Sequence, residues 1–206
     1  MTLPTPAAFN PELSSDRLQH VADWLLQEFY ATQDDLVRPT DTSYTRGCAT
    51  FGRQHSRIVA EWQSKKHPWL GMLNARNATV FTIGGVPCRF SNDNPDNPSK
   101  DAVLGSNPYQ SSFASFVRPG EPAKYCFIVD RGFEGVADPY VALDGYSVEG
   151  VHMCRWTSDP VRAFRSEGSD RPASVEVEKA KLGRKQPAGA TGETPAAAND
   201  DLSELS

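Results

Sequence analysis

The sequence predicts an α+β fold in which two N-terminal helices pack on one face of an antiparallel, mostly meander sheet of about four to six strands. Three observations predict it. Strong helical periodicity is confined to the first third of the chain. Short segments rich in β-branched and aromatic residues follow, separated by turns that contain glycine. The helices also come before the strands, which argues against a parallel α/β sheet, because that fold requires strands and helices to alternate.

Two segments carry the helical spacing. In 15–32 the apolar residues recur at steps of three and four, after N-cap residues at 14–16. The second helix, predicted at 43–64, follows several possible caps at 40–43 and ends before Pro68, which cannot continue a helix. We expect its apolar stripe to face the core, and its members are Tyr44, Cys48, Phe51, His55, Ile58, Val59 and Trp62.

Strands are predicted in the remainder of the domain. Segments 79–83 and 86–90 flank Gly84-Gly85, which is a two-residue hairpin signal. Because proline cannot donate to a strand ladder, Pro87 predicts that the returning strand is an edge strand or is bulged. A long polar loop is expected at 91–110, because Asn, Asp and Pro dominate it.

Further strands are expected at 125–129 and 151–156. Between them, the residues from Tyr140 to Val148 predict a second tight hairpin that turns at Asp144-Gly145. His152 and Cys154 would then point to the same side of a strand, since alternate residues share a face.

The domain organisation follows from composition. A chain of 206 residues predicts one domain plus tails. We expect an extended lead-in at 1–12, where three prolines occur, and a single α+β domain at 13–165. Residues 166–206 combine a charged run with a stretch of mostly Ala, Gly, Pro and Thr, which predicts a disordered tail.

The sequence predicts a cytoplasmic protein that does not associate with a membrane. Residues 1–9 have neither the basic region nor the apolar run of a signal peptide. No stretch approaches the roughly 20 apolar residues that span a bilayer. The four cysteines are widely spaced, with no Cys-x-x-Cys, which favours reduced structural thiols. No prediction of oligomeric state follows.

Positive charge is concentrated in one part of an acidic protein. The whole chain has a net charge of -5, whereas residues 36–90 have +6 and the remainder has −11. At ~100° per residue, Arg46, Arg53 and Arg57 fall on one side of the second helix. With Lys65, Lys66 and Arg76, they form the basic helix face, which we expect to bind nucleic acid or an acidic protein. The alternative is a solvated face, or one paired with the protein's own acids.

An enzyme is the second hypothesis. Carboxylates gather between 130 and 149, and with His55 or His152 they could serve a small metal-dependent hydrolase or nuclease. The Asp…Glu-x-Lys order of many nucleases is absent from this segment, and the Cys and His spacing matches no zinc motif. The sequence therefore favours a non-enzymatic binding or regulatory module and predicts no cofactor and no metal site, while the catalytic residues of the alternative enzyme stay unknown. The carboxylates are Asp130, Glu134, Asp138, Asp144 and Glu149.

Overall fold

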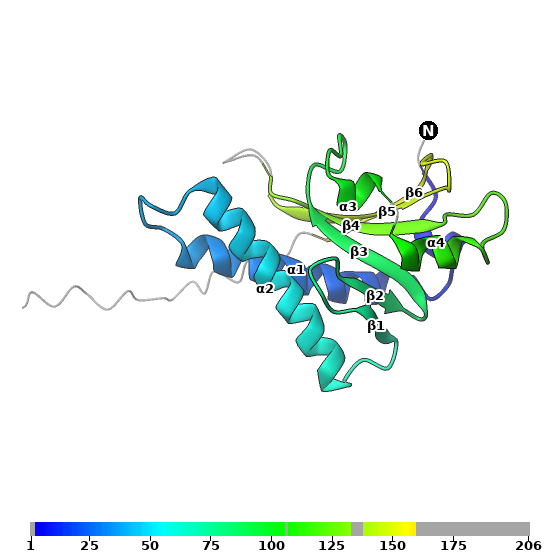
Figure 1. Ribbon diagram of the computed structural model, residues 1–206, viewed down its shortest axis with the longest axis horizontal. Helices are drawn as coiled ribbons and strands as arrows, with labels where there is room; N and C mark the ends of the chain where they lie inside the picture. The colour runs from blue at the N-terminus through cyan, green and yellow to red at the C-terminus, as the bar shows by residue number, and fades with distance from the viewer. Residues whose placement is uncertain (1–2, 106, 133–137, 160–206) are drawn as a thin grey trace, which may run out of the picture. The chain divides into compact units, whose positions relative to one another are not determined.

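A six-stranded mixed sheet forms the centre of the fold in the computed structural model, which describes residues 3–105, 107–132 and 138–159 (Figure 1). The strands lie side by side in chain order: β1 (Leu70–Asn74), β2 (Val80–Ile83), β3 (Val86–Asn92), β4 (Lys124–Asp130), β5 (Tyr140–Tyr146) and β6 (His152–Thr157). The helices are η1 (Pro6–Ala8), α1 (Ser15–Asp35), α2 (Ser43–Ser64), α3 (Asp101–Leu104) and α4 (Pro108–Ala114). The α+β class is thus confirmed, and the predicted tail at 166–206 lies outside the described residues.

The meander prediction is wrong at one point, because β3 and β4 are parallel. Cys88 pairs with Tyr125, and the register continues to Asn92 opposite Val129. A parallel pair needs a long crossover connection, which here carries α3 and α4. The segment expected to be a long polar loop therefore contains two short helices, and it brings the carboxyl ends of β3 and β4 to the same edge of the sheet.

Pro87 lies in an interior strand that pairs with β2 without a register shift, so the expectation of an edge strand or a bulged strand is wrong. The two-residue turn at Gly84-Gly85 makes Ile83 and Val86 a hydrogen-bonded pair, so Thr82 and Pro87 form the next, non-bonded pair. Pro87 also precedes Cys88, the first residue of β3 that pairs with β4. No ladder hydrogen bond is required at its nitrogen, and the strand tolerates the proline.

The second predicted hairpin is displaced. β5 continues through Asp144 and Gly145 to Tyr146, and the turn follows at 147–150. The hydroxyl of Ser147 accepts from the N–H groups of Glu149 and Val151, at 3.2 Å each, and holds this turn. Asp144 is therefore a buried residue in the middle of a strand, with a charge that the interior must satisfy.

The helix α2 begins and ends where the sequence predicted, but it is rotated about its axis. Thr42 caps it by accepting from the N–H of Thr45 at 3.2 Å. Its buried residues are Thr50, Gln54 and Ile58, whereas Tyr44 is 82% exposed. Thr50 and Gln54 tolerate burial because each donates to a backbone carbonyl, of Arg46 and Leu25 respectively. The predicted stripe consequently lies along a flank of α2.

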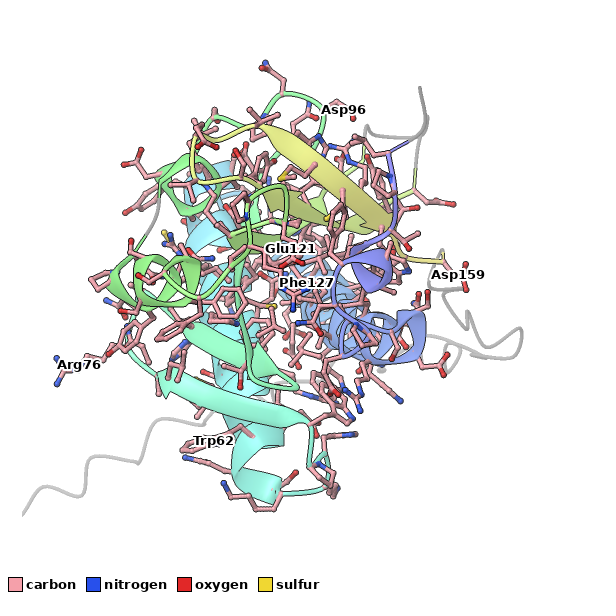
Figure 2. The ribbon with its side chains drawn as sticks, turned by 90° about the vertical axis from the view of Figure 1, so that its right-hand side faces the viewer. Trp62, Arg76, Asp96, Glu121, Phe127 and Asp159 are labelled. Carbon is pink, nitrogen blue, oxygen red and sulfur yellow. The ribbon has the colours of Figure 1, made fainter. Side chains whose placement is uncertain are left out.

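The two faces of the sheet differ in chemistry. Toward α1 and α2 the alternating residues are apolar, and Phe127 lies at the centre of this core (Figure 2). The second face carries a small cluster of Val103 from α3 with Cys126, Ile128 and Tyr146. Because alternate residues share a face, Lys124 and Asp144 also lie on this second side.

The N-terminal lead-in packs against the outer strand. The carbonyl of Pro4 accepts from the backbone N–H of Arg155 at 3.0 Å, and η1 contacts β5 and β6. No helix within the described ranges is long and apolar enough to cross a membrane.

Candidate functional site

The three arginines predicted to form the basic helix face lie beside α1, where its acidic residues neutralise two of them. Arg53 forms an ion pair with Asp35, with 2.7 Å between Nη1 and Oδ2. Arg57 lies 2.9 Å from Glu61 and 3.8 Å from Glu28. The guanidinium of Arg46 donates to the carbonyl of Asp41 at 2.7 Å. These side chains hold α2 against α1 and the preceding loop.

The other three predicted residues lie apart from the arginines. Lys65 adopts a left-handed conformation (φ 57) at the end of α2, and its ammonium is 4.4 Å from the centre of the Trp62 ring. Lys66 is exposed beside it. Arg76 extends outward from the turn between β1 and β2 (Figure 2). The predicted set therefore divides into an α1-facing group and separate exposed cations.

The described carboxylates between 130 and 149 are dispersed over the strand ends and turns. Asp130 ends β4, Asp138 is exposed before β5, and Glu149 lies in the turn after β5. Glu134 is outside the described residues. No group of three or more His, Cys, Asp or Glu that could hold a metal ion occurs within 3–105, 107–132 and 138–159.

His55 has a structural partner. The Thr79 hydroxyl donates to the carbonyl of Arg76 at 3.0 Å, so it accepts from Nδ1 of His55 and ties α2 to the turn before β2. We assign no reacting group to this histidine.

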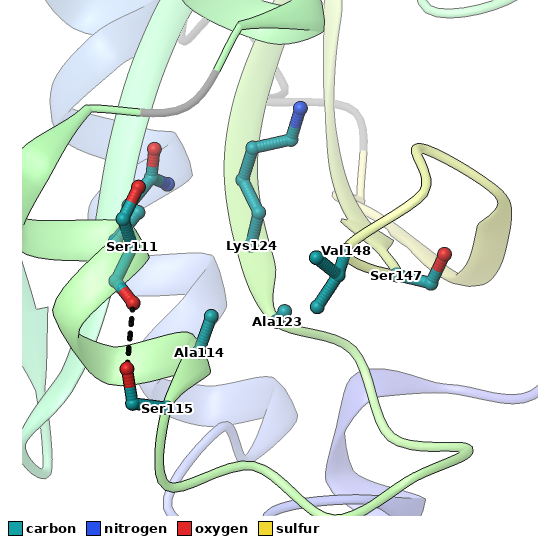
Figure 3. A pocket seen from close by; sticks show the side chains of 8 residues that line it. Ser111, Ala114, Ser115, Ala123, Lys124, Ser147 and Val148 are labelled. Atoms are coloured by element: carbon teal, nitrogen blue, oxygen red, sulfur yellow. Dashed lines mark hydrogen bonds between the residues drawn. The ribbon is translucent and has the colours of Figure 1, made fainter.

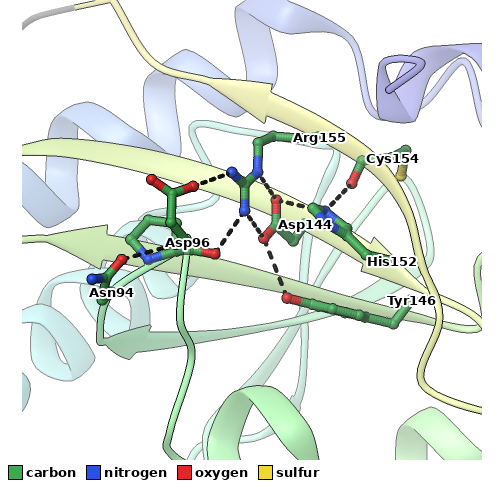
Figure 4. Close-up of polar contacts among 8 residues, drawn as sticks. Asn94, Asp96, Asp144, Tyr146, His152, Cys154 and Arg155 are labelled. Atoms are coloured by element: carbon green, nitrogen blue, oxygen red, sulfur yellow. Dashed lines mark hydrogen bonds and ion pairs between the residues drawn. The ribbon is translucent and has the colours of Figure 1, made fainter. Parts of the chain in front are cut away.

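Asp144 is at the centre of a polar network on the second face of the sheet (Figure 4). Its carboxylate is fully buried and accepts from Arg155 on both oxygens, at 2.8 and 2.9 Å. The Tyr146 hydroxyl donates to it at 3.2 Å, and Nε2 of His152 lies 3.1 Å away. Arg155 also reaches Asp96 at 2.7 Å. The donors around Asp144 are therefore all engaged within the network. Because Arg155 contacts both Asp144 in the sheet and Asp96 in the loop, the network holds that loop to the sheet.

His152 and Cys154 point to opposite sides of β6, contrary to the expectation of a shared face. Tyr146 pairs with His152 while Gly145 pairs with Cys154, so the register shifts by one residue between them. His152 stacks on Tyr146, whereas Cys154 is buried in the core beside Gly145. Burial raises the pKa of the Cys154 thiol to about 12. A zinc site or a Cys–His pair at these two residues is thereby excluded.

A crevice lies between the first turns of α2 and the carboxyl ends of β3 and β4. We call it the α2 crevice. Its two adjoining hollows have volumes of about 360 and 290 Å³ and share Asn92, Lys100 and Arg131. In open α/β sheets, ligands bind outside the carboxyl ends of parallel strands, which is the position of this crevice. The larger hollow is also lined by Ser43, Tyr44, Gly47, Cys48 and Phe51.

Asn92 lines the crevice and is held in place by Gln54. Nε2 of Gln54 donates to the carbonyl of Leu25 at 3.0 Å, which orients Oε1 of Gln54 toward Asn92. Nδ2 of Asn92 donates to that oxygen at 2.8 Å. Asn92 is only 5% exposed, and its Oδ1 has no hydrogen-bond donor among the described residues. A buried polar atom without a partner is costly, and because Oδ1 is inaccessible from outside, a ligand in the crevice does not reach it.

Two cations converge in the crevice. The ammonium of Lys100 donates to the carbonyl of Asn92. Arg131 extends across α2 at Gly47, where an added Cβ would lie 3.3 Å from Nη2. Neither cation forms an ion pair with a described residue. Lys100 and Arg131 therefore bring positive charge to the crevice, and the carboxylates of Asp93 and Asp130 line its smaller hollow beside them.

The loop that carries Lys100 is held by Asp93. Its carboxylate accepts from the backbone N–H groups of Ser99 and Lys100, at 2.9 Å each, and from that of Asn94 at 3.0 Å. Partial burial opposes ionisation of Asp93, but these hydrogen bonds outweigh it, and the pKa is lowered from 3.8. Asp93 thus remains charged at neutral pH and fixes the start of α3 near the crevice.

Comparison with known proteins gives no relative from which a function could be transferred. Searches of protein-family models, curated proteins and solved structures all returned no match. Any proposed function therefore depends on the geometry alone.

Sequence reasoning missed the crevice. Lys100 and Arg131 were assigned to loops, and Asn92 was counted as one of many polar residues in the segment 91–110. The parallel pairing that brings Asn92 and Arg131 together has no local sequence signature, because it depends on a crossover between distant segments. One usable signal was Gly47, since a glycine inside a helix indicates the close approach of another group.

Proposed function

We propose that this protein is a non-catalytic binding module that takes a single-stranded nucleic acid at the α2 crevice. One observation carries the proposal: Lys100 and Arg131 line a single hollow with the exposed ring of Tyr44. A nucleotide brings a phosphate for the cations and a base for the ring. The partner remains the one that charge predicted, while the proposed surface shifts to the amino-terminal end of α2.

The phosphate would lie at the start of α2. The first N–H groups of a helix have no intrahelical acceptor, and the helix dipole adds partial positive charge there. Thr42 satisfies the N–H of Thr45, and Ser43 and Tyr44 line the crevice. Helix N-termini, Arg and Lys are the usual donors to phosphate oxygens.

The base would contact the aromatic wall. Tyr44 is 82% exposed, and the half-buried Phe51 stacks on Phe90 with 5.1 Å between ring centres. Stacking of a base on an aromatic ring contributes roughly 1–3 kcal/mol and requires a strand whose bases are not paired. An acidic peptide would use the cations but has no need of the rings. This difference favours nucleic acid over an acidic protein.

The predicted arginines contribute less in this proposal. Arg53 is engaged by Asp35 of α1, and Arg57 by Glu61 of α2 and Glu28 of α1, so a phosphate would have to compete with those ion pairs. Arg46 lies nearer the start of α2 and donates to a carbonyl rather than to an acid. We expect Arg46 to assist binding at the edge of the crevice.

Fluorescence anisotropy tests the proposal with a labelled single-stranded RNA and DNA of about 12 nucleotides, a length within the usual site sizes. Lys100→Glu and Arg131→Glu should each weaken binding roughly tenfold or more, since each replaces a favourable charge with a repulsive one. Neutral Lys100→Gln and Arg131→Gln should each reduce the salt-dependence slope by about 0.7. Arg118→Glu is the charge-matched control, because it precedes β4 whereas the crevice lies beyond the opposite end of that strand.

Two outcomes would overturn the proposal. One is an affinity for the oligonucleotides that is unchanged by both Glu variants. The other is binding of poly-glutamate, but not of oligonucleotide, with the same dependence on Lys100 and Arg131, which would make the partner an acidic protein. A gel of the oligonucleotide after incubation with Mg²⁺ tests the hydrolase hypothesis separately: intact strands fit a binding module, and shortened strands require an enzyme.

A further inference from the structure

The smaller hollow of the α2 crevice holds opposite charges that do not neutralise one another. The carboxylates of Asp93 and Asp130 line it together with the cations of Lys100 and Arg131, in a volume of about 290 Å³. None of these four side chains forms an ion pair with a described residue. A phosphate in this hollow would meet the cations but would be repelled by the carboxylates. The hollow therefore suits a neutral group that offers hydrogen-bond donors and an acceptor side by side.

The two carboxylates differ in how far the protein already uses them. Asp93 accepts from three backbone N–H groups of the loop that carries Lys100. Asp130, at the end of β4, accepts through Oδ1 from the N–H of Gly132 at 2.9 Å, and its Oδ2 receives no hydrogen bond from a described residue. Because each carboxylate oxygen can accept two hydrogen bonds, Asp130 is the acid that can still accept from a ligand.

The nucleic-acid bases differ in what they offer to a carboxylate beside a cation. The pairing edge of guanine carries the acceptor O6 followed by two donors, N1–H and N2–H₂. Adenine and cytosine each carry one amino group on that edge, and thymine and uracil carry a single N–H between two carbonyls. A carboxylate has two oxygens and can accept from two donors at once. Guanine alone among the common bases therefore gives two donors to a carboxylate and an acceptor to a cation.

We propose that the smaller hollow prefers guanine, an inference that rests on the proposed binding of single-stranded nucleic acid at the α2 crevice. N1–H and N2–H₂ of the base would donate to Asp130, and O6 would accept from Lys100 or Arg131. The two hollows adjoin and share both cations, so one nucleotide can occupy both. The acids beside the cations then select the base, while the larger hollow takes the phosphate.

The pocket between α4 and the turn at 147–150 lacks this combination of charges (Figure 3). None of the described residues that line it is acidic. Its cation, Lys124, is 4% exposed and already donates to the carbonyl of Leu104 at 2.8 Å. Its amide, Gln110, donates to the carbonyl of Tyr125 at 3.1 Å. This pocket lies beyond the opposite end of β4 from the crevice, so Glu149 in its turn is a suitable control position.

Fluorescence anisotropy on the full chain tests the preference with labelled thymidine strands of about 12 nucleotides that carry one variable central base. Guanine is compared with hypoxanthine, which lacks only the amino group, and with cytosine, adenine and thymine. A bidentate contact to the correct base discriminates by about tenfold or more. We expect the guanine strand to bind about tenfold more tightly than the all-thymidine strand, and the hypoxanthine strand to lie between them.

Asp130→Asn locates the contact. Asparagine keeps the shape but replaces one acceptor oxygen with a donor, so the guanine and hypoxanthine strands should bind this variant equally. The all-thymidine strand should bind it at least as tightly as it binds the unaltered protein, because a repulsive charge is removed. Glu149→Gln, which removes a carboxylate beyond the opposite end of β4, should leave the guanine preference unchanged.

The outcomes separate this inference from the proposed function. Equal affinities of the unaltered protein for the five strands, or a preference for another base, overturn the inference while nucleic-acid binding stands. A guanine preference that persists in an Asp130→Asn protein, shown by circular dichroism to be folded, overturns it as well. If none of the strands binds the unaltered protein, the inference and the proposed function both fail.

Discussion

The guanidinium of Arg155 donates two hydrogen bonds to the carboxylate of Asp144, with Nε 2.8 Å from Oδ1 and Nη2 2.9 Å from Oδ2. Asp144 is fully buried, so this contact satisfies a charge that water cannot reach. Its carboxylate raises the pKa of the Arg155 guanidinium, while burial opposes that rise. The guanidinium of Arg155 therefore stays charged and joins the loop at Asp96 to the centre of the sheet.

Removing Arg155 should be strongly destabilising. In Arg155→Met, the buried carboxylate of Asp144 loses its principal cation, and such a loss costs about 3 kcal/mol or more. Asp96→Asn removes only the exposed partner of Arg155 and should cost less than about 1 kcal/mol. Urea unfolding at pH 7 measures both. The double variant Asp144→Leu/Arg155→Met should be more stable than Arg155→Met alone, because it no longer buries an unpaired carboxylate. Equal losses of stability in Arg155→Met and Asp96→Asn would contradict this account.

Asp93 should make the protein more stable above its pKa than below it. Because the folded pKa lies below 3.8, the ionised form is stabilised in the folded state, and that stability is lost as the pH falls through the folded pKa. Asp93→Asn should cost about 1 kcal/mol at pH 7. The difference from the unaltered protein should shrink below pH 3.8. Asp34→Asn is the control, since the described residues donate no hydrogen bond to that carboxylate. A difference that does not shrink at all as the pH falls below 3.8 would argue against the hydrogen-bond explanation.

Lys124 gives the opposite dependence on pH. Its folded pKa lies below 10.5, so the charged ammonium opposes folding at pH 7, and the penalty is relieved as the pH rises through the folded pKa toward 10.5. We expect Lys124→Met to unfold at a higher urea concentration than the unaltered protein at pH 7. The gap should narrow between pH 7 and pH 10. A variant that is less stable at pH 7 would mean that the hydrogen bond to Leu104 outweighs the burial of charge.

Two glycines of α2 allow a matched comparison. Glycine in a helix costs about 1 kcal/mol relative to alanine, so Gly52→Ala, with no atom within 4 Å of the new methyl, should stabilise the protein by that amount. Gly47→Ala places the methyl 3.3 Å from Nη2 of Arg131 and should displace that guanidinium. Thermal unfolding measures the effect of each variant on stability, and oligonucleotide anisotropy measures its effect on binding. Only Gly47→Ala should weaken binding, and equal affinities in the two variants would remove Arg131 from the proposed interface.

Local signals in the sequence predicted much of the fold. The capping residue Thr42 and the break at Pro68 gave the limits of α2, and Gly84-Gly85 gave the hairpin of β2 and β3. These features depend on residues close together in the chain. The rotation of α2 was not predictable from apolar periodicity, because the side toward the core carries Thr50 and Gln54. Both are satisfied by backbone carbonyls, one of them from another helix.

The candidate sites depend on pairings between distant segments. Asp144-Gly145 has the composition of a tight turn, yet Arg155 on the neighbouring strand allows the aspartate to be buried within β5. Asn92 and Gln110 each resemble any polar loop residue until their amide groups are fixed by Gln54 and Tyr125. Such roles follow from three-dimensional hydrogen bonding, which composition does not encode.

The position of Pro4 beside Arg155 affects how this sheet meets other copies of itself. An open strand edge exposes unpaired N–H and C=O groups that can recruit another chain. Along β6 that edge is occupied by the lead-in, through the hydrogen bond from Arg155 and the contacts of η1. At the opposite edge, the pairing of β1 with β2 is irregular between Met72 and Asn74, which disrupts the flat template that aggregation requires. Resistance to edge-to-edge association thus resides in the lead-in from Pro4 to Ala8 and in one irregular strand.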